Sequence, residues 1–323
     1  MPGFEVIGKE EFSEIKHLFD ESKVLFRHSF DHLRNDIYKV KEFEEAFAKR
    51  MKTPHALGVT SGTAALRIAL AALDIKKGDE VIVPSMTFIA PVNAIRYNGA
   101  EPIFMDNDDF YTIDINKTID FINNETRKVS GATVNKRTGK KISAIVIVHV
   151  FGNAVKLNDL QAICKKRNIV LIEDAAESVG TFYTTGRYKK KHTGTIGTIG
   201  CLSFNGNKII TTGGGGMILT DDGDLAHRLM HPRYEIDKRY RASVRGIPSR
   251  RSLQILREGI ALGGRIAAPA QVKILKGSES QEGCDLELCV HEGRKHQIKR
   301  MCEAVGHRVT ALHRVAFAGL TTA

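Results

Sequence analysis

Tryptophan is absent from the 323 residues, and prolines number only 8. No apolar run approaches the roughly 18 residues of a membrane-spanning helix. The opening, MPGFEVIGKEEFSEIKHLF, mixes acidic with basic side chains, whereas a signal peptide has a basic start followed by an apolar run. Hydrophobic residues make up 42% of the chain and charged residues 26%, which is ordinary for a globular protein. These features argue against a membrane-spanning protein and predict a cytoplasmic one.

Cysteine is also scarce, and its five positions include no CxxC pair. The cysteines are Cys164, Cys201, Cys284, Cys289 and Cys302. An odd number without paired spacing does not fit a disulfide framework or a zinc site. We therefore expect reduced thiols, as in the cytosol, and no metal site.

Acidic residues are too few to balance the basic ones, so the net charge is +11. The surplus is denser in the tail, because residues 221–323 hold 18 lysines and arginines against 12 aspartates and glutamates. Residues 1–220 hold 30 against 25 over twice that length. A basic tail is compatible with contact to phosphate or RNA, and a solvated charged face is the alternative.

Helices and strands are predicted to alternate between residues 41 and 174. The segments DEVIVPS, EPIFMD, AIVIVHV and IVLIED are typical of strands, and GTAALRIALAAL is typical of a helix. Continuous apolar runs of this length suit strands covered on both faces, which predicts an α/β fold with a mostly parallel sheet. The polar segment 121–141 interrupts the alternation and is expected to be a surface loop.

Beyond residue 220 the pattern changes. KRYRASVRG, APAQVKILK and CDLELCVHEG alternate as strands do, whereas SRRSLQILREGI and the basic KHQIKRMCEAVGH are helical. This order predicts a compact α+β arrangement with antiparallel strands. We therefore divide the chain into two domains, residues 1–220 and 221–323.

Two short motifs in the first domain follow predicted strands. Ser61, Gly62 and Thr63 lie between a strand and a helix, where free N–H groups and the helix dipole can hold a phosphate. A plain turn with a helix cap is the alternative. Asp174 ends the strand of LIEDAAES, at the sheet edge where ligands usually bind. It can pair with a protonated ring nitrogen, or it can cap the next helix.

Two further motifs complete the set. In CLSFNGNKIITTGGGGM, Lys208 lies in a polar, glycine-rich setting that suits Schiff-base chemistry, although most lysines near glycines are surface residues. Ser203 can bind a phosphate oxygen, and Gly213 to Gly216 permit close backbone approach. In PSMTFIA, Phe88 can stack on a planar ring or serve as a core residue.

Residues 1–220 resemble the DegT/DnrJ/StrS sugar aminotransferases, which depend on pyridoxal 5'-phosphate. The likeness is carried by VTSGTAALRIALAALDIKKGDEVIVPSMTFIAPVNAIRYNGAEPIFMD, IEDAAESVGTFY and HTGTIGTIGCLSFNGNKIITTGGGGMI. SFNGNKIITTGGGGMI looks most like the LegC-type nucleotide-sugar aminotransferases of nonulosonate biosynthesis. The opening residues are closer to a relative that acts on an eight-carbon keto-sugar acid. The resemblance implies the large domain of a fold-type-I transferase with a mostly parallel sheet, and a homodimer.

The resemblance also implies a role for each motif residue. Lys208 would carry the internal aldimine and move the proton, while Asp174 would pair with the pyridinium nitrogen. Phe88 would stack on the ring, and Gly62, Thr63 and Ser203 would hold the phosphate. Glu177 stands where many relatives have a glutamine that contacts the ring hydroxyl. The implied reaction moves an amino group, typically from glutamate, to a keto-sugar or nucleotide-keto-sugar in the synthesis of surface polysaccharide.

Residues 221–323 resemble the RsuA/RluB-type ribosomal RNA pseudouridine synthases. The likeness lies in LTDDGDLAHRLMHPRYEIDKRYRASVRG, APAQVKILK and HEGRKHQIKRMCEAVGHRVTALHRVAFAGL. It implies that Tyr240 lies against the target base. It also implies that the RNA backbone meets four basic residues, Arg294, Lys295, Lys299 and Arg300.

Each resemblance lacks a part. The synthases need an aspartate nucleophile upstream of LTDDG, and here that segment is ITTGGGGMI, which has no carboxylate. The aminotransferases continue into a smaller domain that closes the substrate site, and residues 221–323 replace it. The chain is therefore an apparent chimera. We expect an aminotransferase that the replacement impairs, with an RNA-modifying or RNA-binding protein and a non-functional polypeptide as the alternatives.

Overall fold

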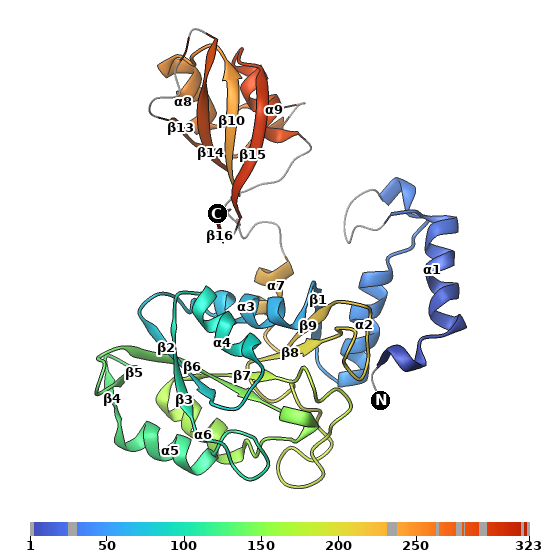
Figure 1. Ribbon diagram of the computed structural model, residues 1–323, viewed down its shortest axis with the longest axis vertical. Coiled ribbons are helices and arrows are strands. Elements are labelled where there is room, and N and C mark those ends of the chain that lie inside the picture. The colour runs from blue at the N-terminus through green and yellow to red at the C-terminus, as the bar shows by residue number, and fades with distance from the viewer. Residues whose placement is uncertain are drawn as a thin grey trace. The chain divides into compact units, whose positions relative to one another are not determined.

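A computed structural model of the chain divides into two compact units, residues 1–230 and 231–323. The structure describes residues 3–24, 31–230, 238–262, 265–275, 280, 282–290, 296–317 and 320–321. Each unit has its own sheet and its own apolar core, and Figure 1 labels their elements.

The first unit is built on a sheet in the order β1-β9-β8-β7-β6-β2-β3. Its strands are β1 (His55–Val59), β2 (Asp79–Pro84), β3 (Glu101–Met105), β6 (Lys141–Val148), β7 (Val170–Asp174), β8 (Ile199–Ser203) and β9 (Gly216–Thr220). The strands from β8 to β3 run parallel, and β9 is antiparallel to both β8 and β1. The predicted α/β fold with a mostly parallel sheet is confirmed.

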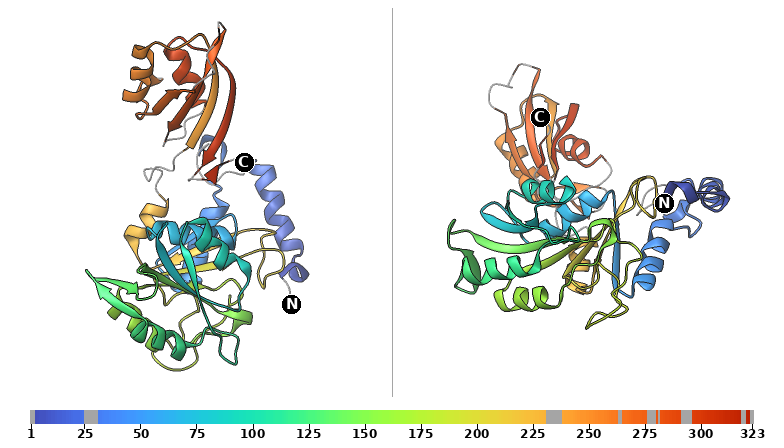
Figure 2. Two further views of the ribbon diagram at one scale, coloured as in Figure 1. Left: turned by 60° about the vertical axis from the view of Figure 1, so that its left-hand side comes forward. Right: turned by 60° about the horizontal axis from the view of Figure 1, so that its bottom comes forward.

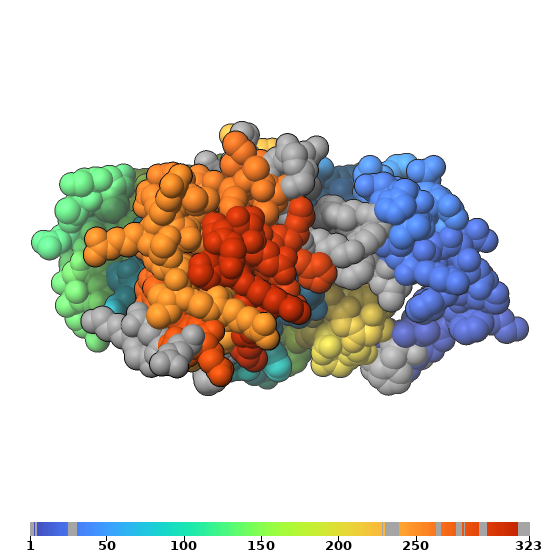
Figure 3. Space-filling model, turned by 90° about the horizontal axis from the view of Figure 1, so that it is seen from above, coloured from blue at the N-terminus to red at the C-terminus, as the bar shows by residue number. Residues whose placement is uncertain are grey.

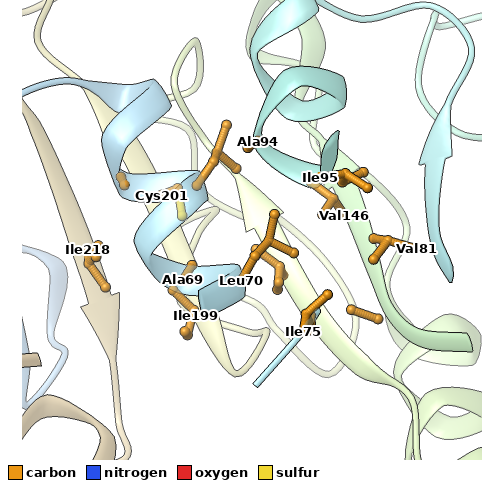
Figure 4. Close-up of a cluster of buried hydrophobic side chains, with 14 of the residues drawn as sticks. Ala69, Leu70, Ile75, Val81, Ala94, Ile95, Val146, Ile199, Cys201 and Ile218 are labelled. Carbon is orange, nitrogen blue, oxygen red and sulfur yellow. The ribbon is translucent and has the colours of Figure 1, made fainter. Parts of the chain in front are cut away.

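Helices cover both faces of this sheet, as the two views of Figure 2 show. One face carries α3 (Gly62–Ala72), α4 (Ile89–Tyr97) and α7 (Gly223–Met230), and the other carries α5 (Ile115–Asn124) and α6 (Asn158–Arg167). Because strand side chains alternate, Val81 faces the first layer and Ile82 the second. Figure 4 shows Leu70 and Ile95 meeting Val81 and Val146 in the first layer.

The polar segment 121–141 is not a simple surface loop. It completes α5 and then forms a hairpin of β4 (Thr126–Val129) and β5 (Ala132–Asn135), which pairs with β6. Its buried polar groups find partners nearby, since Asn135 donates to Glu80 at 2.8 Å. The prediction of a surface loop was wrong because it relied on the polarity of the segment and missed the turn at Ser130 and Gly131, both of which have positive φ.

Among the described residues, the helices that precede β1 in the chain are η1 (Gly3–Val6), α1 (Lys9–Glu21), η2 (Asp31–Leu33) and α2 (Lys39–Met51). The short helix η3 (Val150–Gly152) follows β6. The division between units lies after Met230 and not after residue 220 as the sequence predicts. The reason is α7, whose Leu225 and Ala226 are buried in the core of the first unit.

The second unit is an antiparallel sheet in the order β13-β14-β10-β15-β16 with two helices among its described residues. Its elements are β10 (Lys238–Arg245), α8 (Arg250–Glu258), β11 (Ala261–Leu262), β12 (Arg265–Ile266), β13 (Gln271–Ile274), β14 (Gly283–Val290), α9 (Gln297–Ala304), β15 (Val309–Phe317) and β16 (Leu320–Thr321). Its core includes Leu256 of α8, Met301 of α9 and Leu286 of β14. The described residues of this unit gather into one body, drawn in orange and red in Figure 3. The predicted antiparallel α+β pattern is confirmed.

Candidate functional site

The four motifs of the first unit meet in one cavity of about 540 Å³ at the carboxyl ends of the parallel strands. Its walls come from the turns after β1, β2, β6, β7 and β8. The lining includes every first-unit residue for which the sequence predicts a role at the cofactor, namely Gly62, Thr63, Phe88, Asp174, Glu177, Ser203 and Lys208.

One end of the cavity is formed by the start of α3 against the end of β8. Ser61 caps α3 by accepting a hydrogen bond from Ala64 N at 3.0 Å, so this turn is a helix cap as well as a candidate anion site. A Cβ on Gly62 would lie 2.7 Å from Ser203 Cβ. Only glycine permits this approach, which brings the Ser203 hydroxyl to the positive end of the α3 dipole. A phosphate oxygen is the group that this combination suits.

Asp174 also lines the cavity and is 5% exposed. Burial raises the pKa of its carboxyl to about 6, against the smaller opposing effects of the Ala176 N–H and the Lys208 charge. Because burial destabilises its ionised form, this carboxylate would be strongly stabilised by a cationic partner. The alternative role as a helix cap is excluded, because the stretch from Asp174 to β8 is described throughout and contains no helix.

Lys208 projects into the cavity and has a side chain only 17% exposed. Its Nζ lies 3.2 Å from Glu177 Oε1 and 6.0 Å from the centroid of the Phe88 ring. The other oxygen of Glu177 accepts a hydrogen bond from Phe151 N at 3.0 Å. Lys208 is therefore not an ordinary surface lysine. Phe88 is 70% exposed at the cavity, so it is not a core residue either.

Three further residues support the site and were missed by the sequence analysis. Gly3 N donates to Lys208 O at 2.6 Å and braces the lysine loop from the chain's start. His149 and Glu173 are fully buried beneath Asp174, with Nε2 and Oε2 2.9 Å apart. Because His149 Nδ1 accepts from Val155 N, its Nε2 carries the proton and donates to Glu173.

Glu173 gathers three backbone donors besides His149. They are Gly194 N at 2.9 Å, Ile196 N at 2.6 Å and Gly197 N at 2.5 Å. The donors outweigh the cost of burial, so the pKa of Glu173 is lowered. This carboxylate ties the segment before β8 to the end of β7. The sequence signal for this carboxylate was the pair of adjacent acids that ends VLIED, because neighbouring residues of a strand face opposite sides of the sheet.

The cavity fits a planar, cationic ring that bears an anionic group and a carbonyl carbon. The buried acid Asp174 suits the cation, the Gly62–Ser203 contact suits the anion, and Lys208 suits the carbonyl carbon. Thr87 adds an unused group, since its buried Oγ1 has no hydrogen-bond partner among the described residues. A buried hydroxyl on the cavity wall without a partner points to a polar ligand there.

Three of the five second-unit residues for which the sequence predicts RNA contact lie in the described part of the chain. Tyr240 is half-buried and packs against the core of that unit, whereas Lys299 and Arg300 are exposed on α9. Arg294 and Lys295 lie outside the described residues. The predicted contacts of these residues with RNA remain predictions.

All five cysteines are buried and none forms a disulfide, and burial raises the pKa of Cys164 and Cys302 to about 12. Within the described ranges, no helix combines the length and apolarity needed to cross a membrane.

Two family models match the chain. The DegT/DnrJ/EryC1/StrS aminotransferase family matches residues 29–250, and RNA pseudouridylate synthase matches residues 212–304. The two matches share residues 212–250, which contain the segment where the sequence changes from one likeness to the other.

Curated relatives include GDP-perosamine synthases. The one from Escherichia coli O157:H7 is 42% identical over 192 residues, which are 59% of this chain and 47% of the relative. The one from Vibrio cholerae is 37% identical over 204 residues, 62% of this chain and 50% of the relative. The chain therefore spans about half the length of the curated relatives it matches.

Solved structures show the same half-length match. An aminotransferase from Psychrobacter cryohalolentis has a TM-score of 0.55 at 29% identity, covering 69% of this chain and 50% of that one. A single-residue mutant of the GDP-4-keto-6-deoxymannose-3-dehydratase ColD, with bound GDP-perosamine, has a TM-score of 0.56 at 28% identity. That match covers 70% of this chain and 52% of the dehydratase.

Proposed function

Because the chain belongs to the DegT/DnrJ/EryC1/StrS aminotransferase family, we propose that it is a pyridoxal-phosphate-dependent aminotransferase. It transfers an amino group, from glutamate as donor, to the keto carbon of a nucleotide-linked or free keto-sugar. The observation that carries the proposal is that Lys208, whose side chain is mostly buried, shares one cavity with the buried Asp174. The names of the GDP-perosamine synthases support a nucleotide sugar as the acceptor, and the product would serve surface-polysaccharide synthesis.

Bound pyridoxal phosphate would supply an aldehyde and a ring that accepts electrons during the transfer. Asp174 would hold the ring nitrogen in its protonated form, because an ionised buried carboxylate stabilises a cation beside it. Phe88 would stack against the ring, and Gly62, Thr63 and Ser203 would hold the phosphate. Lys208 would bind the cofactor covalently through Nζ and then move a proton at the substrate carbon.

Glu177 has a specific place in this scheme. Its contact with Lys208 at 3.2 Å makes it the partner of the amine before the cofactor binds. The amine must lose a proton to become a nucleophile, and Glu177 is within reach to accept it. A ring-hydroxyl contact, the role that the family likeness implies for this position, is compatible with the same place on the cavity wall.

A titration with pyridoxal phosphate tests the proposal. The wild-type chain should bind the cofactor and develop the visible absorption of a lysine-bound form. Lys208→Ala should lose that band, whereas Lys128→Ala, which removes an exposed lysine of β4, should keep it. An unchanged spectrum in Lys208→Ala would contradict the proposal.

A second candidate function belongs to residues 231–323. The match of residues 212–304 to RNA pseudouridylate synthase, with the exposed Lys299 and Arg300 on α9, favours RNA binding by this unit. Binding to ribosomal RNA fragments should weaken steeply as salt rises. We expect no uridine isomerisation, since ITTGGGGMI supplies no carboxylate nucleophile. If the chain binds neither the cofactor nor RNA, the third alternative holds, which is a polypeptide without function.

A further inference from the structure

Two exposed aromatic residues beside the cavity have an unfavourable backbone conformation. Tyr111 has φ 62° and Phe151 has φ 53°, in the left-handed region that bulky side chains rarely adopt. Their rings meet edge to face with centroids 6.3 Å apart, and they are 50% and 69% exposed. Strained backbone and exposed apolar surface are both unfavourable. Such residues persist where the surrounding structure enforces them, and they concentrate at functional sites.

The strand ends around Tyr111 enforce its conformation. Its carbonyl accepts a hydrogen bond from Asn107 Nδ2 at 2.7 Å, and its N–H donates to Asp108 O at 3.0 Å. Asn107 Oδ1 in turn accepts from Ser85 Oγ and from Met86 N, both at 2.9 Å. The turn that holds Tyr111 is therefore fixed to the end of β2, which leads directly into the cavity wall at Phe88.

Phe151 is fixed to the reactive part of the cavity. Its N–H donates to Glu177 Oε2 at 3.0 Å, while Glu177 Oε1 lies 3.2 Å from Lys208 Nζ. One carboxylate thus separates the Phe151 backbone from the amine. Gly152 continues the turn with φ 85°, and Thr181 Oγ1 donates to its carbonyl at 3.1 Å.

We propose that Tyr111 and Phe151 form an aromatic platform that binds the apolar face of the sugar ring and presents its keto carbon to the site. This inference rests on the proposed function. Sugar C–H groups carry a slight positive charge and suit the negative face of an aromatic ring. The nearness of Phe151 to Lys208 favours the hexose as occupant. A nucleotide base would lie farther away, since a ribose and a diphosphate separate it from the hexose.

Binding of GDP-mannose and of GDP to the full chain tests the platform by calorimetry. Wild type should bind GDP-mannose more tightly than GDP. Phe151→Gly and Tyr111→Gly should each weaken GDP-mannose binding about fivefold or more, taking aromatic stacking as a guide, and leave GDP binding unchanged. Phe104→Ala, which removes a 53% exposed phenylalanine from β3, is the matched control and should change neither.

Thermal melting separates a binding role from a structural one. Glycine relieves the strain at both positions, so Phe151→Gly and Tyr111→Gly should melt at or above the wild-type temperature. A variant that melts lower, or that binds GDP-mannose as tightly as wild type, would overturn the proposal, as would a wild type that binds both ligands equally. The cofactor band at Lys208 should persist in both variants. Absence of that band in wild type would instead refute the proposed function.

Discussion

In the first unit, residues from five separate turns converge on one cavity, whereas in the second unit the three singled-out residues that the structure describes are divided between core and surface. Asp174 and Lys208 lie far apart in the chain and still line one cavity. Tyr240 packs into its own core while Lys299 and Arg300 face solvent. Parallel strands bring their carboxyl ends to a single edge, and that geometry assembles a site from distant motifs. Antiparallel strands alternate in direction, so their carboxyl ends are divided between two edges.

The largest effect should come from the buried carboxylate of the first unit. Glu173→Ala removes the acceptor of three backbone N–H groups and of His149, which should cost about 5 kcal/mol or more of unfolding free energy, because each buried unsatisfied group costs about 1–3 kcal/mol. Urea unfolding measures it. Glu287→Ala is the matched change in the second unit. It breaks the partly exposed pair with Lys273 and should cost about 1 kcal/mol or less. Equal losses of unfolding free energy in the two variants would contradict this contrast between the two units.

A core truncation in the second unit should leave the cofactor site intact. Leu286→Ala removes a fully buried side chain and should destabilise this unit by about 2–5 kcal/mol. Hydrogen exchange of β14 would report the loss. The cofactor band at Lys208 should be unchanged, because all the residues that line the cavity belong to the first unit. A weaker band would show that the site depends on the second unit.

Asp174→Asn should stabilise the chain without cofactor while weakening cofactor binding. Burial raises the pKa of Asp174 to about 6 from an ordinary value of 3.8, so the folded state disfavours the ionised form. This penalty is full above pH 6 and vanishes below the unfolded value. The raised pKa of Asp174 corresponds to a loss of about 3 kcal/mol of unfolding free energy at pH 8. Urea unfolding should show the gain at pH 8 and its decline as the pH falls from 6 towards 4. A gain independent of pH would refute this origin.

The smallest effect concerns α9. Lys299→Ala should reduce the slope of RNA affinity against salt by about one unit and weaken binding uniformly across sequences. Lys128→Ala, in the first unit, is the control and should leave the slope unchanged. An unaltered slope in Lys299→Ala would show that this face of α9 is solvated and does not contact RNA.

Much of the first unit could be predicted because its signals are local. Apolar runs marked the buried strands, and the residues after each run marked the cavity edge. The hairpin at 126–135 was missed because polar strands give no apolar signal. The assignment of α7 to the first unit was missed because the family likeness changes near residue 220, whereas the core of the first unit continues into α7. His149 and Gly3 could not be found locally, since their partners lie far along the chain.

Some features of the site depend on relations that a single sequence does not contain. The family likeness implies that Glu177 contacts the cofactor, but only the structure joins it to both Lys208 and Phe151. Positive φ at Tyr111 and Phe151 is likewise invisible in their residue types, which would favour ordinary strand geometry.

Reduction of the cofactor-loaded chain with borohydride, followed by peptide mass spectrometry, tests the central claim most directly. The account predicts that the pyridoxyl mass is found on the peptide that contains Lys208. A label on another lysine, or no label under saturating cofactor, would contradict it.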